Sequence, residues 1–229
     1  MEIEMKALCQ SDQIYKLFEN KFNNFTKVGT NIDKLLFKSD RYYSWGGEQL
    51  PNPKKIYRVR TEAEIARLAD ADGATERAYQ VQKFFDSENI RQDDHSKYSV
   101  FLTYKEHNIL PDGSQNNIEN ESKISFEAAE TFDIIMKSMG FDIYFAKSKK
   151  SCSMYYMSNK NGLVLHCEIV KVNSLPVYLE VEFVIDDDKA IDAVRKRISD
   201  TIKEFFQELD IVSFESRNWK QLIEEQGQL

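Results

Sequence analysis

Several features that mark common protein classes are missing from this 229-residue sequence. No apolar run approaches the roughly 20 residues that a membrane-spanning helix needs, and the first residues, MEIEMK, lack the apolar core of a secretory signal. The three cysteines, Cys9, Cys152 and Cys167, are an odd number without metal-type spacing. We therefore expect a cytoplasmic protein with no membrane partner, no disulfide framework and no zinc site.

An excess of positive charge is also missing. The chain has 31 Lys and Arg residues against 38 Asp and Glu residues, a net charge of −7, which argues against a uniformly basic nucleic-acid binder. Aromatic residues, in contrast, are plentiful, with 15 Phe and 11 Tyr, so the chain has the means to fold as a globule. Its length and the lack of internal repeats fit a single domain over residues 1–229.

Three helices are predicted from apolar residues at helical spacing. They span residues 12–24, with Ser11 as N-cap and Phe25 on the apolar stripe, residues 126–139, ended by Gly140, and residues 188–209. A shorter last helix over 216–226 would bury Trp219, Leu222 and Ile223. Residues 61–84 also have helical content, although their apolar stripe is weak.

Eight further segments alternate between apolar and charged residues, as strands with one buried face do. They are residues 2–7, 55–60, 100–105, 118–125, 141–149, 153–157, 163–172 and 177–185. Loops are expected over 46–53 and 86–97, and a tight turn over 111–114. This order of elements predicts an α+β protein with an antiparallel sheet.

The polar faces of these strands are mostly charged, and the two signs fall largely on separate strands. A half-solvated sheet with its charges in water is the usual explanation for one such strand. The alternative is a closed or nearly closed eight-stranded antiparallel β-barrel, with helices packed on the outside and charges projecting into a lumen that holds one small ligand. The carboxylates are Glu2, Glu4, Glu119, Glu121, Glu168, Glu180 and Glu182, and the cations are Lys6, Arg58, Arg60, Lys105, Lys147 and Lys149.

A lumen that contains both signs of charge specifies the chemistry of its ligand. Paired carboxylates bind Mg²⁺ or Mn²⁺, which are hard cations that prefer oxygen ligands. Arginine and lysine side chains bind phosphate oxygens. A polyphosphate together with its metal ion needs both kinds of residue.

The N-terminal sequence Glu2-Ile3-Glu4-Met5-Lys6 resembles the ExExK signature of the CYTH superfamily, the triphosphate tunnel metalloenzymes. That superfamily includes class IV adenylate cyclases, thiamine triphosphatases and inorganic tripolyphosphatases. Further segments are similar to its D-x-Y-Y, R-x-R, lysine, acidic, K-x-R and LExE motifs, in the same order and over the whole chain. They are residues 40–43, 57–60, 103–105, 119–121, 147–150 and 178–182.

The sequence departs from the family pattern in a few places. Asn117 stands where Arg is common, Lys149 or Lys150 replaces an Arg, and Glu168 replaces an Asp. The segment of about 62–98 is longer than in compact members, and we expect it to form an inserted arm or lid.

The resemblance implies a role for each charged position. Mg²⁺ or Mn²⁺ would be bound by carboxylates, and the triphosphate would be held by cations, with Glu4, Lys6 and Glu182 as the catalytic residues. The implied metal ligands are Glu2, Glu4, Glu168, Glu180 and Glu182, with Glu121 as a further candidate. The implied triphosphate-binding residues are Lys6, Arg58, Arg60, Lys105, Lys147 and Lys149.

Three functions are consistent with these residues. The first is a metal-dependent hydrolase of a small-molecule triphosphate such as thiamine triphosphate, tripolyphosphate or a nucleoside triphosphate. The second is a class IV adenylate cyclase, and the third is a module that binds polyphosphate without turnover. Neither a nucleic acid nor a membrane is an expected partner, whereas a homodimer is allowed. His166 is either an acid–base group in the lumen or a hydrogen-bonded neighbour of the site.

Overall fold

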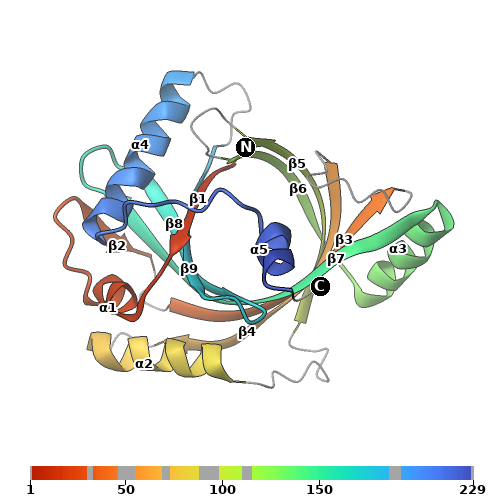
Figure 1. The fold of residues 1–229 in the computed structure, drawn as a ribbon, viewed down its shortest axis with the longest axis horizontal. Coiled ribbons are helices and arrows are strands. Elements are labelled where there is room, and N and C mark those ends of the chain that lie inside the picture. Colours follow the sequence, from red (N-terminus) through yellow and green to blue (C-terminus); the bar gives the residue numbers. More distant parts are fainter. Residues whose placement is uncertain are drawn as a thin grey trace.

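The computed structural model describes residues 2–29, 33–45, 55–68, 73–87, 98–109, 115–185 and 192–227. Figure 1 shows the arrangement of its strands and helices. The strands are β1 (Glu2–Leu8), β2 (Phe25–Val28), β3 (Asp33–Trp45), β4 (Lys55–Leu68), β5 (Tyr98–Ile109), β6 (Gln115–Ile124), β7 (Phe141–Ser158), β8 (Val164–Val172) and β9 (Val177–Val184). The helices are α1 (Ser11–Glu19), α2 (Gly73–Asp86), α3 (Phe126–Ser138), α4 (Asp192–Glu208) and α5 (Trp219–Glu225).

Eight of these strands form a hydrogen-bonded ring. Their order is β7-β3-β4-β5-β6-β1-β9-β8, and a further pairing of β7 with β8 closes it. Every pairing is antiparallel, and β2 extends the sheet beside the last residues of β7. The predicted eight-stranded antiparallel barrel with helices around it is therefore confirmed.

The apolar faces of the strands point away from the ring and into cores beneath the helices. One buried cluster joins Ile3 of β1 and Val181 of β9 to Phe205 of α4, and it continues under α1 and α2. A second cluster joins Val59 of β4 to Met136 of α3. Burial of these outer faces is the main favourable contribution to folding, and it leaves the charged faces to line the interior.

Helix α5 lies across one end of the ring (Figure 1). Asn218 caps its N-terminus, where its side chain accepts a hydrogen bond from the Gln221 backbone N–H. Leu222 and Ile223 are buried in a cluster with Tyr42 and with apolar residues near the ends of β7, β8 and β9. The predicted burial is confirmed for Leu222 and Ile223, whereas Trp219 is only partly buried, and α5 packs against that end of the barrel interior.

The helical content predicted over 61–84 is only partly correct. Residues 61–68 continue β4, which pairs with β3 as far as the partners Leu68 and Asp33. Glu62 and Glu64 alternate here with Ala63, and the cross-strand pairing outweighs the helix propensity of the EAEIARL segment. Residues 73–86 do form a helix, α2, which packs on α1 in the main core. This part of the expected arm therefore lies against the body of the fold.

The helix predicted over 12–24 is shorter than expected. It ends at Glu19 because Asn20 takes a left-handed conformation, with φ of 53°. Gln10 rather than Ser11 is its N-cap. Phe25 is still buried, but it begins β2, a strand that the alternation of apolar residues did not reveal.

Residues 141–149 and 153–157 belong to one 18-residue strand, β7, instead of two. The predicted loop over 46–53 and the turn over 111–114 lie outside the described residues, as do residues 88–97 of the polar run. Among the described helices, none is long and apolar enough to cross a membrane.

Candidate active site

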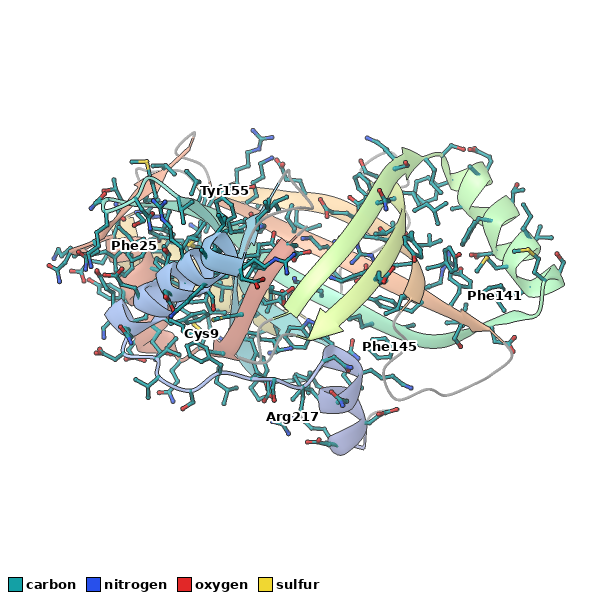
Figure 2. The ribbon with its side chains drawn as sticks, turned by 90° about the horizontal axis from the view of Figure 1, so that it is seen from above. Cys9, Phe25, Phe141, Phe145, Tyr155 and Arg217 are labelled. Carbon is teal, nitrogen blue, oxygen red and sulfur yellow. The ribbon has the colours of Figure 1, made fainter. Side chains whose placement is uncertain are left out.

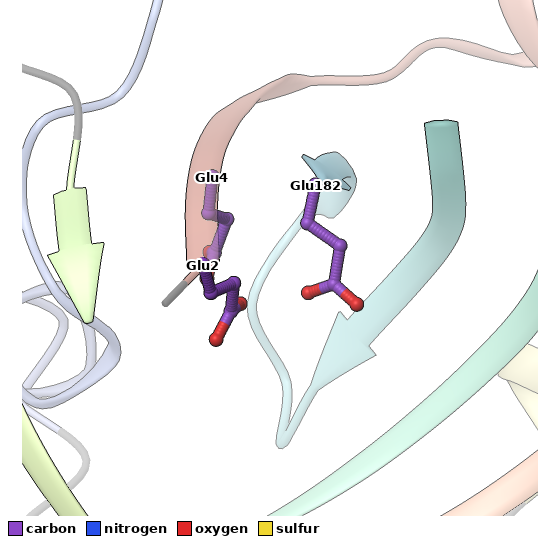
Figure 3. A group of neighbouring side chains, drawn as sticks. All are labelled: Glu2, Glu4 and Glu182. Atoms are coloured by element: carbon purple, nitrogen blue, oxygen red, sulfur yellow. The ribbon is translucent and has the colours of Figure 1, made fainter. Parts of the chain in front are cut away.

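Three carboxylates meet inside the ring, as Figure 3 shows. Glu2 and Glu4 project from β1 and Glu182 from β9, with Glu4 and Glu182 directly opposite each other. One oxygen of each side chain lies within 4.8 Å of the others. Such a set of hard oxygen donors suits Mg²⁺ or Mn²⁺.

The close approach of these carboxylates changes their affinity for protons. Burial, with Glu180 as a like-charged neighbour, raises the pKa of Glu4 from its ordinary 4.5 to about 7. Burial also raises the pKa of Glu2. Glu182 behaves differently: burial opposes its ionisation, but hydrogen bonds from His166 and Glu2 lower its pKa. Glu2 and Glu4 therefore bind protons more tightly than ordinary carboxyl groups do, and a metal ion would have to displace those protons.

His166 is hydrogen-bonded on both sides. Its Nδ1 lies 2.6 Å from Glu182 Oε1, and its Nε2 lies 2.7 Å from Ser153 Oγ. The ring of Tyr155 stacks on the imidazole at 4.8 Å between centroids. Of the two expectations for His166, the structure shows the hydrogen-bonded neighbour.

Glu168 and Glu180 are held by lysines, although both were predicted as metal ligands. Lys149 Nζ lies 2.6 Å from Glu168 Oε2 and 2.5 Å from Glu180 Oε2, while Lys38 Nζ lies 2.7 Å from Glu168 Oε1. Although burial alone would raise the pKa of Glu180, Lys149 and Lys6 lower it to about 2. These two carboxylates are therefore ionised and already carry cationic partners.

Arg58 and Lys105 form a cationic group beside the three carboxylates. Lys105 Nζ lies 3.9 Å from Glu2 Oε2 and also contacts Glu119. Arg58 donates to Thr103 and to Glu121, at 3.1 and 3.2 Å from its Nη2. The carboxylate group and the cation group therefore touch through Lys105.

A second buried cluster surrounds Asp40. Its carboxylate accepts hydrogen bonds from Arg60 Nε and Nη2, at 2.8 and 3.1 Å, and Lys147 Nζ lies 3.8 Å away. Burial lowers the pKa of Lys147 to about 7, despite the opposing effect of Asp40. A phosphate placed near this amine would favour its protonated form.

Lys6 lies at the closed end of the interior. Its ammonium donates to the Arg217 carbonyl at 2.7 Å and sits 4.5 Å from the centre of the Trp219 ring. The indole Nε1 of Trp219 donates in turn to Glu180 at 2.9 Å. In Figure 2, Arg217 lies at this end of the barrel and Tyr155 at the other.

All the predicted site residues lie among the described residues, and their contacts form separate groups inside the ring. The carboxylate trio adjoins Lys105, Lys149 pairs with Glu168 and Glu180, and Asp40 pairs with Arg60 and Lys147. Lys6 contacts Trp219, which donates a hydrogen bond to Glu180. Sequence reasoning missed Lys38, the role of Asp40, Ser153 and the position of Trp219. Lys38, Asp40 and Tyr42 share one face of β3, so their spacing of two residues was the available signal. The contacts of Ser153 and Trp219 depend on the tertiary fold and left no such signal.

The fold that carries this site also occurs in other proteins. No family model and no curated protein matches the sequence. Among solved structures, the PH1819 protein from Pyrococcus horikoshii OT3 is 18% identical with a TM-score of 0.65, and the alignment covers 99% of each chain.

Two other solved structures carry functional descriptions. A candidate adenylate cyclase from Vibrio parahaemolyticus is 11% identical with a TM-score of 0.57, and 97% of each chain is covered. A candidate adenylyl cyclase from Hippeastrum, described as revealing a dominant triphosphatase activity, is 13% identical with a TM-score of 0.54, over 100% of this chain and 97% of that one. The chain therefore shares the fold of these candidate cyclases, as its resemblance to the CYTH superfamily predicts.

Proposed function

We propose that the protein is a divalent-metal-dependent triphosphatase that acts on a small-molecule triphosphate inside the barrel. The observation that carries this proposal is the contact of Lys105 with Glu2, at 3.9 Å, which joins a carboxylate trio to a group of cations within one ring. A phosphate-binding site alone needs only cations, so the three carboxylates favour an enzyme over a binding module.

The carboxylate trio would hold the metal ion. Glu2, Glu4 and Glu182 supply oxygen donors of the kind that Mg²⁺ and Mn²⁺ prefer. When bound, such a cation neutralises charge on phosphate oxygens and on the leaving group. Because Glu168 and Glu180 are paired with Lys149, we assign them the task of holding that lysine in place.

The cations would bind and orient the triphosphate. Arg58 offers a planar pair of donors, which suits phosphate oxygens, whereas Lys105 and Lys147 act as point charges. Lys6 and Lys149 complete the set toward the closed end. Helix α5 limits access of bulk water from that end, since Leu222 and Ile223 are buried against the ends of the strands.

The nucleophile separates the two enzymatic alternatives. In a hydrolase it is a water molecule, and no protein nucleophile is needed. In an adenylate cyclase it is the 3′-hydroxyl of ATP itself. The triphosphatase activity in the description of the Hippeastrum protein supports the first alternative, and the cyclase names of both described neighbours support the second.

One experiment distinguishes all three functions. Purified protein is incubated with ATP, thiamine triphosphate or tripolyphosphate, each with Mg²⁺ and with Mn²⁺, and the products are identified. Orthophosphate is the expected product. Cyclic AMP with pyrophosphate would instead indicate the cyclase, and binding of all three without turnover would indicate the polyphosphate-binding module.

Variants connect the activity to the site. Glu4→Gln and Glu182→Gln should each abolish turnover, because they remove a carboxylate from the trio. Glu204→Gln is a matched control, because Glu204 forms a surface ion pair with Lys160. Full activity in a Glu4→Gln, Glu182→Gln double variant would overturn the metal assignment.

A further inference from the structure

We propose that His166 is a positioning residue that holds the Glu182 carboxylate in place for a divalent cation, as the middle member of a hydrogen-bond chain that starts at Ser153. This inference rests on the proposed function, because it takes Glu182 as a metal ligand. It assigns a role to two residues, Ser153 and His166, that belong to neither the carboxylate trio nor the phosphate-binding cations.

The strand register places His166 directly beside the trio. On one side it is opposite Tyr155 of β7, and on the other it is opposite Glu182 of β9. Glu182 is in turn opposite Glu4 of β1. Glu182 therefore has a like-charged carboxylate on one side and an imidazole on the other.

Both nitrogens of the imidazole are used by protein groups. Nδ1 carries a hydrogen, because its partner at 2.6 Å, Glu182 Oε1, is an acceptor when ionised. In the neutral ring Nε2 then accepts from Ser153 Oγ–H, at 2.7 Å. One tautomer satisfies both contacts, and a turn of the ring would break them.

Tyr155 holds the imidazole from a third direction. The two rings stack at 4.8 Å between centroids, with 25° between their planes. His166 is half-buried beneath this contact. The ring is therefore fixed both in its plane, by two hydrogen bonds, and across its plane, by stacking.

This arrangement has a direct consequence for metal binding. In the ionised form that binds a cation, the three carboxylates repel one another, and the hydrogen bond from His166 opposes a turn of Glu182 away from Glu2 and Glu4. The hydrogen bond from His166 fixes the orientation of the Glu182 carboxylate through Oε1. Groups that orient a metal ligand in this way typically change metal affinity by about 10- to 100-fold.

The test is Mn²⁺ binding by the full-length protein, measured by titration calorimetry and by electron paramagnetic resonance. His166→Ala should weaken binding by about 10- to 100-fold. His166→Asn should restore most of the affinity, because its amide N–H lies near the position of Nδ1. His166→Gln should not, because its amide reaches the position of Nε2, toward Ser153. Ser153→Ala should cause a smaller loss than His166→Ala.

Two controls make the outcomes distinct. Thr26→Val removes one surface hydrogen bond, to Asn159 on the outside of the ring, and should leave affinity unchanged. Glu4→Gln should abolish Mn²⁺ binding, because it removes a carboxylate from the trio. If the unmodified protein binds no Mn²⁺, the proposed function fails and the inference fails with it.

Two results would overturn the inference alone. In the first, Mn²⁺ binds the unmodified protein and not Glu4→Gln, yet binds His166→Ala as tightly as the unmodified protein. In the second, His166→Asn and His166→Gln lose affinity equally and both lower the thermal midpoint. That second pattern would show a packing role.

Discussion

Arg60 holds Asp40 through two hydrogen bonds, from Nε to Oδ1 at 2.8 Å and from Nη2 to Oδ2 at 3.1 Å, on neighbouring strands inside the ring. Asp40 is almost fully buried. Because an unpaired buried cation is costly, Asp40→Asn should lower the free energy of unfolding by about 3–5 kcal/mol. Chemical denaturation measures this loss.

A surface ion pair gives the comparison for that variant. Glu204→Gln removes the partner of Lys160 and should change the free energy of unfolding by no more than about 1 kcal/mol. If Asp40→Asn and Glu204→Gln had equal denaturation midpoints, the buried pair would have no special structural role.

Lys149→Met should destabilise the protein in a pH-dependent way. Glu180 has its pKa lowered from 4.5 to about 2, and Glu168 is shifted in the same direction, with Lys149 as the strongest charge that opposes burial for both. Lowered carboxyl pKa values stabilise the fold above about pH 4.5, and this stabilisation is lost as pH falls toward 2. The loss of stability in Lys149→Met, relative to the unmodified protein, should thus be largest near neutral pH.

Thermal unfolding across pH 2–8 measures the effect of Lys149→Met. We expect the difference in stability between the two proteins to shrink steadily below pH 4.5. A difference that stays constant over the whole range would mean that lost packing, rather than lost charge pairing, explains the variant.

Metal affinity should rise with pH between about 5 and 7. The pKa of Glu4 is raised to about 7, so a cation must displace its proton at lower pH. The expected rise is about tenfold per pH unit for one proton released. Titration with Mn²⁺ in buffers from pH 5 to pH 8 measures it.

The same raised pKa affects the metal-free protein in the opposite sense. A raised carboxyl pKa stabilises the fold at low pH, and this contribution falls as pH rises from about 4.5 to 7. Protein kept metal-free with a chelator should accordingly lose stability between about pH 4.5 and pH 7, and excess Mn²⁺ should restore that stability. Constant affinity between pH 5 and 7 would contradict the assignment of Glu4.

Arg58→Ala should raise KM for any triphosphate that the protein processes. A charge-assisted hydrogen bond contributes about 1.5–3 kcal/mol, which corresponds to roughly a 10- to 150-fold change. Arg67→Ala is the matched control, because Arg67 lies on the same strand and pairs only at the surface with Glu64. An unchanged KM in Arg58→Ala would exclude Arg58 as a phosphate ligand.

The strands of the ring could be predicted because one face of each is apolar and the other is charged. β3 is the exception and was expected only from the D-x-Y-Y resemblance. Its apolar run over residues 35–37 and a register shift between Leu35 and Leu36 disturb the alternation. Closure of the ring could not be derived from single strands, since it depends on pairings such as β7 with β8.

The candidate site was predictable in its residue types and less so in its contacts. Glu4 and Glu182 were expected together, and they do lie opposite each other. Glu180 was expected beside a metal but contacts Lys149 and Trp219. The periodicity of the sequence identifies the face of the strand on which a side chain lies. The residue that the side chain contacts depends on the neighbouring strands and on α5.

The most direct test of the account is anomalous diffraction from crystals grown with Mn²⁺ and tripolyphosphate. We predict a manganese peak between Glu2, Glu4 and Glu182, with the phosphate chain running toward Arg58 and Lys105. A manganese peak between Glu168 and Glu180, with Lys149 displaced, would contradict the account, as would a phosphate chain bound outside the barrel.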